Sequence, residues 1–140
     1  MNAEYMIDTN VLVYAIDQSA ENEPKKKVAV DLLASVDFGL STQVLQEFYV
    51  TATRKIRKPL TQVNALAFLE KLEVFPIIPG SYRLVLQGVK NSLKYQLSYW
   101  DGAILAAAEE LGAKTLYSED LNDGQLYGTV RVINPFTSGL

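Results

Sequence analysis

The hydrophobic residues of the chain fall into short runs that alternate with longer stretches of helical period. The short runs predict strands at Glu4–Ile7, Asp37–Leu40, Val74–Ile78, Lys114–Tyr117 and Thr129–Ile133. The longer stretches predict helices at Val11–Ile16, Pro24–Ser35, Gln43–Ile56, Thr61–Leu72, Tyr82–Tyr95 and Ser98–Leu111. Strands separated by helices imply right-handed crossovers and a parallel sheet with helices on both faces. We therefore expect an α/β fold of three layers, α/β/α, around a central parallel sheet of about five strands.

The 140 residues have the length of one domain. The sequence contains no internal repeat, low-complexity tract or Pro/Gly/Ser linker that would divide it, so we expect a single domain over residues 1–140. It also lacks the Gly-rich patterns G-x-G-x-x-G and G-x-x-x-x-G-K-[ST]. A dinucleotide-binding domain and a P-loop NTPase are thereby disfavoured.

The composition is ordinary for a globular protein, with 49% hydrophobic and 21% charged residues. No apolar run approaches the roughly 18 residues of a membrane span, and Met1–Tyr5 carry no basic region followed by an apolar stretch. We therefore expect no membrane association and a cytoplasmic location. Because 13 Lys and Arg face 16 Asp and Glu, the net charge is −3. A polyanion would need a local basic patch or bound cations.

The chain has no Cys and no His, which narrows its chemistry. Disulfides, thiolate nucleophiles, Ser-His-Asp triads and zinc sites built from Cys or His are all excluded. Carboxylate, hydroxyl, amide, Lys, Arg and Tyr chemistry remains. Carboxylate, hydroxyl and amide oxygens are the ligands suited to Mg²⁺ or Mn²⁺.

Acidic residues follow two of the predicted strands. Asp8, in the stretch "YMIDTN" at residues 5–10, stands where the first strand ends, and Ser118, Glu119 and Asp120 follow the fourth. The carboxyl ends of parallel strands lie along one edge of a sheet, where ligands usually bind. Asp8 is either the N-cap of the next helix, since Asp is a favoured cap residue, or a metal ligand. Both interpretations remain open at this point.

Two further acidic residues are expected near the same edge. Asp101 lies on the apolar face of its predicted helix, three residues after Ser98, so it is either part of a capping box or a site residue. A site at the helix N-terminus would satisfy both interpretations. Glu47 falls in the first turns of the helix after the second strand and is either a solvated helix residue or close to the same edge.

Such a cluster of carboxylates needs compensation. Four carboxylates about 6 Å apart form six pairs, each repelling by roughly 3 kcal/mol at an effective dielectric constant of 20. Without a cation or a raised pKa, the site would destabilise the fold. The pattern therefore indicates a divalent metal, or a proton shared between neighbouring carboxylates.

Four segments, in order along nearly the whole chain, carry a resemblance to a known family. They are "MIDTNVLVYA" at residues 6–15, "STQVLQEFY" at 41–49, "YWDGAILAAA" at 99–108 and "LYSEDLNDGQ" at 116–125. Together they resemble a PIN domain, most of all the VapC-type ribonuclease toxins of bacterial and archaeal toxin–antitoxin pairs. The acidic residues of the family fall on Asp8, Glu47, Asp101 and Asp120, and its polar helpers on Thr9, Asn10 and Ser118.

The resemblance implies metal-dependent hydrolysis of an RNA phosphodiester, with one or two Mg²⁺ or Mn²⁺ ions. Asp8 and Asp101 are then the expected direct ligands, while Glu47 and Asp120 bind through water, complete a second metal site or position the nucleophile. It further implies a cognate antitoxin protein as partner, and a homodimer, since dimers are common in the family.

Three details are ambiguous in the sequence. Glu119 or Asp123 can replace Asp120 as the fourth acid, although Asp123 in "NDG" has the surroundings of a turn residue. The densest basic stretch, "RKIRKP", offers substrate contacts at Arg54, Lys55, Arg57 and Lys58, or merely offsets a helix dipole. Trp100 is expected in the core, with stacking on a base as the alternative.

Two other functions remain in competition with the ribonuclease. One is a receiver-type phosphoacceptor module, which also combines acidic strand ends with Mg²⁺. That fold needs an acceptor Asp at the end of its middle strand, whereas the third strand here ends in "IIPG". The other is a catalytically idle domain whose acidic edge docks a basic partner.

Overall fold

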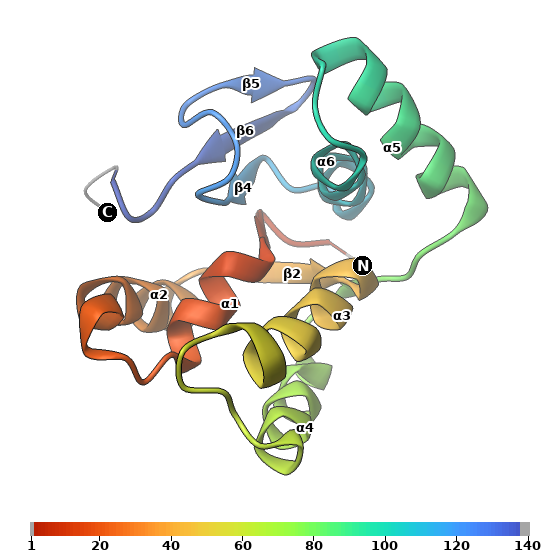
Figure 1. The fold of residues 1–140 in the computed structure, drawn as a ribbon. Helices are drawn as coiled ribbons and strands as arrows, with labels where there is room; N and C mark the ends of the chain where they lie inside the picture. The colour runs from red at the N-terminus through yellow and green to blue at the C-terminus, as the bar shows by residue number, and fades with distance from the viewer. Residues whose placement is uncertain (1, 138–140) are drawn as a thin grey trace.

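Short strands form one sheet at the centre of the computed structural model, which describes residues 2–137 (Figure 1). In chain order they are β1 (Tyr5–Ile7), β2 (Phe38–Ser41), β3 (Ile77–Ile78), β4 (Thr115–Tyr117), β5 (Leu126–Tyr127) and β6 (Val130–Ile133). Their spatial order is β3-β2-β1-β4-β6-β5. The neighbours pair in parallel, except β5, which pairs antiparallel with β6. The predicted parallel sheet is confirmed, with β5 as an additional edge strand.

Helices cover both faces of the sheet, which confirms the predicted three layers. They are α1 (Thr9–Ile16), α2 (Glu23–Ser35), α3 (Thr42–Val50), α4 (Gln62–Lys71), α5 (Tyr82–Tyr95) and α6 (Tyr99–Leu111). Figure 1 shows α1 to α4 on one side of the sheet and α5 and α6 on the other. Helix α6 contacts most of the strands, and α5 packs on α6. Within residues 2–137, no helix has both the length and the apolar composition needed to cross a membrane.

Two predicted elements differ from the structure. The predicted strand Val74–Ile78 is a 3₁₀ turn at Leu72–Val74 followed by the short strand β3. Pro76 explains the delay, because it has no N–H group for a strand ladder and contributes only its carbonyl, which accepts from the Leu40 N–H. The predicted helix Gln43–Ile56 is α3, which ends at Val50 and continues as a π-helical turn over Thr51–Lys55.

The register of the sheet determines where the candidate site forms. Ile7 at the end of β1 pairs with Tyr117 at the end of β4, so Asp8 and Ser118 follow on adjacent strands. Ile7 and Leu116 are completely buried, which fixes both strands in the core. Helix α1 begins directly after β1, and α3 begins directly after β2. The carboxyl edge of the sheet therefore gathers two strand ends and two helix N-termini.

Candidate active site

Asp8 is held by one hydrogen bond to each carboxylate oxygen. Oδ1 accepts from the N–H of Thr9 at 2.7 Å, and Oδ2 accepts from the hydroxyl of Ser118 at 2.7 Å. Asp8 is thus the N-cap of α1, and it is only 6% exposed. The capping interpretation is therefore confirmed. It does not exclude metal binding, because each carboxylate oxygen keeps further lone pairs.

The surroundings of Asp8 disfavour its charged form. Burial raises the pKa of this carboxyl group to about 7, and the negative charges of Asp120 and Glu47 act in the same direction. The hydrogen bonds from Ser118 and Thr9 oppose the shift but do not cancel it. A bound cation would reverse this balance and hold Asp8 as a carboxylate at neutral pH.

Asp120 is oriented by the same polar residues. The side-chain amide of Asn10 donates to Asp120 Oδ2 at 3.1 Å and to the Ser118 hydroxyl at 3.4 Å. The backbone N–H of Asp120 donates to the Ser118 hydroxyl at 3.1 Å. Ser118 is completely buried, whereas Asp120 is exposed. Asn10 and Ser118 thus hold Asp120 against the end of β4 with its carboxylate accessible.

Glu47 joins the cluster from the other side of Asp8. The hydroxyl of Thr9 donates to Glu47 Oε1 at 2.9 Å, and the side-chain amide of Gln43 approaches the same oxygen at 3.5 Å. Gln43 is four residues before Glu47 and therefore lies on the same face of α3. Thr9 connects the two acids, because its N–H binds Asp8 while its hydroxyl binds Glu47.

Asp101 approaches from the first turn of α6. Its backbone N–H donates to the hydroxyl of the N-cap residue Ser98 at 3.1 Å, so half of the predicted capping box is present. Burial raises the pKa of the Asp101 carboxyl group, and the charge of Asp120 adds to the shift. Asp101 therefore lies at a helix cap and near another site carboxylate at the same time.

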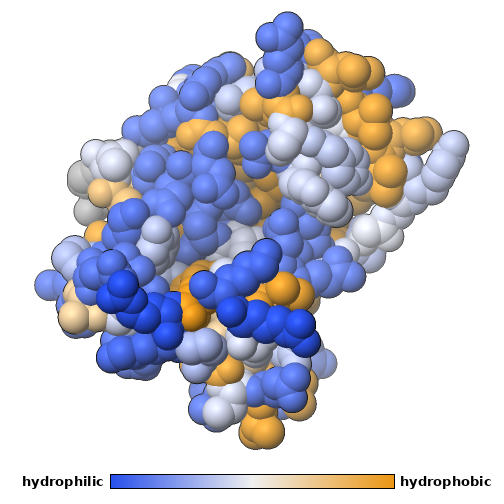
Figure 2. All heavy atoms as spheres, in the orientation of Figure 1, coloured by the Kyte–Doolittle hydropathy of each residue, from blue (hydrophilic) through white to orange (hydrophobic). Residues whose placement is uncertain are grey.

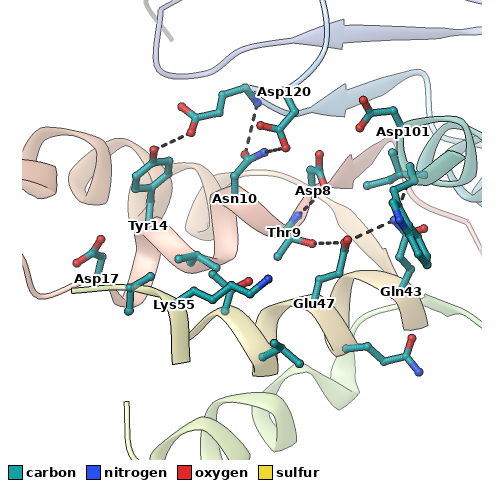
Figure 3. A pocket seen from close by; sticks show the side chains of 18 of the residues that line it. Asp8, Thr9, Asn10, Tyr14, Asp17, Gln43, Glu47, Lys55, Asp101 and Asp120 are labelled. Atoms are coloured by element: carbon teal, nitrogen blue, oxygen red, sulfur yellow. Dashed lines mark hydrogen bonds between the residues drawn. The ribbon is translucent and has the colours of Figure 1, made fainter. Parts of the chain in front are cut away.

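These side chains line one cleft of about 650 Å³. Figure 3 shows Asp8, Asp101 and Asp120 directed toward a shared space, with Glu47 and Thr9 below it. Thr9 and Asn10 also line the cleft. The structure thus brings together the four acids and the polar residues that the sequence singled out.

The donor set fits a hard divalent cation, because it consists of carboxylate, hydroxyl and amide oxygens. Among the described residues, no three acidic side chains lie close enough together to hold a metal ion between them. Mg²⁺ usually retains several water ligands and takes one or two carboxylates from the protein, so it would not need three of these acids at once. The raised pKa of Asp8 indicates a carboxyl group that a cation would stabilise in its charged form.

The two alternative acids, Glu119 and Asp123, form hydrogen bonds or ion pairs with residues outside the acidic cluster. Glu119 lines the cleft, but Oε1 accepts from the hydroxyl of Tyr14 at 2.6 Å and Oε2 pairs with Nζ of Lys25 at 3.0 Å. Asp123, in the turn before β5, accepts from the backbone N–H of Asn134 after β6 at 2.8 Å. Asp120 is therefore the residue of this segment whose carboxylate faces the other acids.

The basic stretch contributes one residue to the cleft. Lys55 lines it from the π-helical turn, where Ile56 N–H reaches back to the Thr51 carbonyl. Arg57 instead pairs with Glu21 at 3.4 Å on the surface. Arg54 and Lys58 are exposed and do not line the cleft. Of the four basic residues predicted as substrate contacts, Lys55 alone lines the cleft.

Some residues that hold the acids were not predicted from the sequence, and one residue was misplaced. Gln43 and Tyr14 line the cleft, and Lys25 pairs with Glu119 beside it, yet only Gln43 had a local signal, its spacing of four from Glu47. The prediction that Trp100 belongs to the core is wrong, because its side chain is 60% exposed. Trp100 stands in the first turn of α6, where it lines the cleft instead of the core.

The fold and the site together define an α/β protein with an acidic, oxygen-lined cleft at the carboxyl edge of a parallel sheet. The sequence profile of the PIN domain matches residues 5–123, so the chain belongs to the PIN-domain family. No curated protein sequence matches the chain significantly.

Solved structures of toxin–antitoxin proteins share the fold at low sequence identity. A toxin–antitoxin complex from Klebsiella pneumoniae aligns with a TM-score of 0.70 and 20% identity, covering 94% of this chain and 97% of the other. VapC20 from Mycobacterium tuberculosis, a sarcin–ricin loop cleaving toxin, aligns with a TM-score of 0.67 and 20% identity. The alignment covers 83% of this chain and 89% of VapC20. DNA-bound VapBC from Salmonella typhimurium aligns with a TM-score of 0.64 and 16% identity, and the alignment covers 93% of this chain and 96% of the other. The fold is thus that of VapC-like PIN domains.

Proposed function

We propose that this protein is a metal-dependent endoribonuclease and the toxin of a toxin–antitoxin pair. The observation that carries the proposal is the cleft in which Asp8, Glu47, Asp101 and Asp120 face one another. Membership of the PIN-domain family and the shared fold with toxin–antitoxin proteins support it. One of the similar structures is described as a sarcin–ricin loop cleaving toxin, which supports RNA as the proposed substrate.

The residues of the chain divide the work between ligation and positioning. Asp8 and Asp101 would hold one Mg²⁺ or Mn²⁺ ion, and Glu47 and Asp120 would bind through water or complete a second site. When bound, such an ion lowers the pKa of a water molecule and offsets charge on the phosphate. Ser118 and the Thr9 N–H keep Asp8 in one orientation.

The remaining polar contacts serve the two flanking acids. Asn10 fixes Asp120 through its side-chain amide, and the Thr9 hydroxyl fixes Glu47. Hydrogen bonds of this kind restrict each carboxylate to one geometry before substrate arrives. Because the chain has no His, the carboxylates of the cleft would orient the attacking water.

The receiver-type alternative gains no support from the structure. The third strand, β3, lies at an edge of the sheet instead of its middle, and it is followed by Pro79 and Gly80 instead of an acceptor carboxylate. The idle docking domain differs from the nuclease only in activity, and the cleavage assay below separates the two.

An antitoxin is the partner that the proposed function requires. A cleft with this density of carboxylates would accept a basic segment of another protein in place of the metal and RNA. A small open reading frame adjoining the gene, whose product copurifies with this protein, would support the pair.

The outer face of α5 is the surface we assign to a homodimer. Val85, Leu86, Val89 and Leu93 are all exposed on it. Figure 2 shows an apolar patch over α5 at the upper right of the molecule. The helix carries Arg83, Lys90 and Lys94 but no acidic residue. An unpaired apolar face of this kind favours association with a second copy.

Cleavage of labelled RNA in Mg²⁺, Mn²⁺ or EDTA tests the proposed function. We expect the wild-type protein to cut in either metal and not in EDTA, and Asp8→Asn and Asp101→Asn to abolish cutting. Asp31→Asn, the same change at an exposed position of α2, is the matched control and should cut normally. Cutting that survives in both site variants contradicts the assigned site. No cutting on a broad RNA panel, with stable binding to a protein partner, favours the docking domain.

A further inference from the structure

Trp100 is an exposed aromatic side chain at the mouth of the acidic cleft. It is the only Trp of the chain, it is 60% exposed, and it lies next to Asp101 in the first turn of α6. Removing the apolar surface of this ring from water is favourable, so a ligand that covers the ring binds more tightly. The fold keeps this ring in the solvent beside the site carboxylates.

The indole of Trp100 contacts a neighbouring ring, and the backbone of Trp100 is hydrogen-bonded to α3. The ring of Tyr99 packs against it at 5.0 Å between centroids with an interplanar angle of 73°. The Trp100 carbonyl accepts a hydrogen bond of 3.2 Å from the side-chain amide of Gln43, which also reaches Glu47. The same amide therefore connects the backbone of Trp100 to a carboxylate of the cleft. The contact with Tyr99 restricts the ring on one side before a ligand covers the other.

A second, smaller groove meets the acidic cleft at Trp100. Its volume is about 170 Å³, and it lies between the N-terminal turns of α3, α5 and α6. Trp100, Gln43 and Gln46 line both the groove and the acidic cleft. Leu84 and Tyr99 supply apolar walls to the groove. Pockets for drug-sized ligands run to roughly 300–1,000 Å³, so this groove suits a single ring system.

The groove also offers a polar group for recognition. Within residues 2–137, the side-chain amide of Gln46 has no hydrogen-bond partner, and its residue is exposed. An amide carries both donors and an acceptor, which can meet the edge of a nucleobase. Aromatic rings combined with amide side chains are typical of sites that bind unpaired bases of RNA.

Electrostatics alone would hold RNA weakly at this site. The net charge is −3, the cleft is lined by carboxylates, and Lys55 is the one residue of the basic stretch that reaches it. Stacking does not depend on the charge of the phosphate and strengthens binding by about 5- to 100-fold per base. A stacked base beside the carboxylates would therefore supply binding that the charges do not.

We infer that Trp100 and the adjoining groove bind one unpaired nucleobase next to the phosphate that is cut. This inference rests on the proposed ribonuclease function. It assigns the substrate an unpaired base at the site, with the indole of Trp100 stacking on it and Gln46 contacting its edge.

The fluorescence of the single Trp reports the contact directly. The assay uses wild-type protein in EDTA and a short single-stranded RNA, the same RNA annealed to its complement, and a backbone of the same length without bases. We expect the single strand to quench Trp100 fluorescence and the other two to leave it unchanged. Equal quenching by the strand without bases, or no quenching by the single strand, overturns the inference.

Substitutions of Trp100 measure how much its side chain contributes to the affinity for RNA. By polarisation of labelled single-stranded RNA, Trp100→Ala should weaken binding about 5- to 100-fold, and Trp100→Phe should retain most of it. Tyr82→Ala is the matched control, because Tyr82 is 79% exposed but lines neither cavity. Circular dichroism checks that each variant is folded. Wild-type affinity in Trp100→Ala contradicts the inference.

The inference and the proposed function fail separately. If the wild-type protein cuts no RNA in any metal but single strands still quench Trp100, the nuclease proposal fails and the base site stands. If the protein cuts RNA and Trp100→Ala leaves KM unchanged, the base site is wrong and the nuclease stands. Supporting kinetics are a raised KM in Trp100→Ala with a smaller change in kcat.

Discussion

The hydroxyl group of Ser118 donates a 2.7 Å hydrogen bond to Oδ2 of Asp8, joining residues 110 positions apart in the sequence. Ser118 is completely buried and Asp8 is 6% exposed, so Asp8 forms part of the cleft floor and Ser118 lies behind it. The contact places Asp8 where water cannot fully solvate its charge. The same burial raises the pKa of Asp8 to about 7.

The first prediction is that metal-free protein becomes less stable as the pH rises from 4 to 8. The pKa of Asp8 is about 7 in the folded state and 3.8 by reference, so between these values the unfolded chain releases a proton that the folded chain retains. Stability therefore falls with pH across this window and levels off above 7, and the loss is at most about 4 kcal/mol.

Thermal unfolding of wild type, Asp8→Asn and the Asp31→Asn control measures this effect in EDTA. Asn is also a good N-cap, so Asp8→Asn keeps the helix start and removes the charge. We expect Asp8→Asn to melt above wild type at pH 8 and close to it at pH 4. Mg²⁺ should raise the Tm of wild type at pH 8 but not that of Asp8→Asn. A difference between the two that does not change with pH would contradict the assigned cause.

Much of the fold and the acidic set follows from local pattern. Short apolar runs and helical periods locate most elements, and the strand ends locate Asp8 and Asp120 because parallel topology brings them to one edge. Asp101 is apparent because a carboxylate on an apolar helix face is unusual. Each of these signals comes from residues that are close together in the sequence, where hydrophobic and polar patterns are informative.

The contacts between distant segments have no such signal. Lys25 and Glu119 are 94 positions apart, and nothing near either residue predicts their 3.0 Å contact. The strand β5 has only two residues and follows a turn at Gly124, whose φ of 83° only Gly adopts readily. The π-helical turn at Thr51–Lys55 has hydrogen bonds between residues five apart instead of four. The spacing of apolar residues along the sequence does not reveal this difference.

The second prediction concerns Gly102, which follows Asp101 in α6. In an exposed helix, Gly→Ala stabilises by up to about 1 kcal/mol. Here a Cβ atom would lie 2.5 Å from the carbonyl oxygen of Gly88 and 2.9 Å from the backbone nitrogen of Ser92 in α5. Backbone atoms cannot turn away, so Gly102→Ala should destabilise by about 1–3 kcal/mol and lower the Tm.

The matched control is Gly80→Ala. A Cβ atom there would meet only the Thr42 hydroxyl, at 3.3 Å. We expect its Tm to stay near wild type. Because displacement of α6 would move Asp101, Gly102→Ala should also lose nuclease activity below its melting temperature. A Gly102→Ala protein as stable as wild type would show that α5 and α6 can separate without loss.

The third prediction concerns the apolar face of α5. Sedimentation equilibrium should find the wild-type protein as a dimer and Leu93→Glu as a monomer, because a charge at a 76% exposed position disrupts association but not folding. Val63→Glu on α4 is the control, since Val63 is 75% exposed and lies on another helix. A wild-type protein that stays monomeric at every concentration argues against the assignment, as does a Leu93→Glu dimer.

The fourth prediction separates Asp120 from its neighbour Glu119. Tyr14 and Lys25 hold the two oxygens of Glu119, while Asp120 accepts from Asn10 and remains exposed toward Asp8 and Asp101. Asp120→Asn should therefore lower metal-dependent cleavage by at least about tenfold. Glu119→Gln should cut at a rate close to wild type, with a modest loss of stability, because the contact with Lys25 is partly exposed.

Rates measured over a range of Mg²⁺ concentrations make the comparison sharper. If Asp120 helps to hold the ion, part of the loss in Asp120→Asn should be recovered at high Mg²⁺, whereas Glu119→Gln should show the wild-type dependence on Mg²⁺. The reverse result, in which Glu119→Gln needs more metal and Asp120→Asn does not, would exchange the roles of the two residues. It would require Lys25 and Tyr14 to release Glu119 when the ion binds.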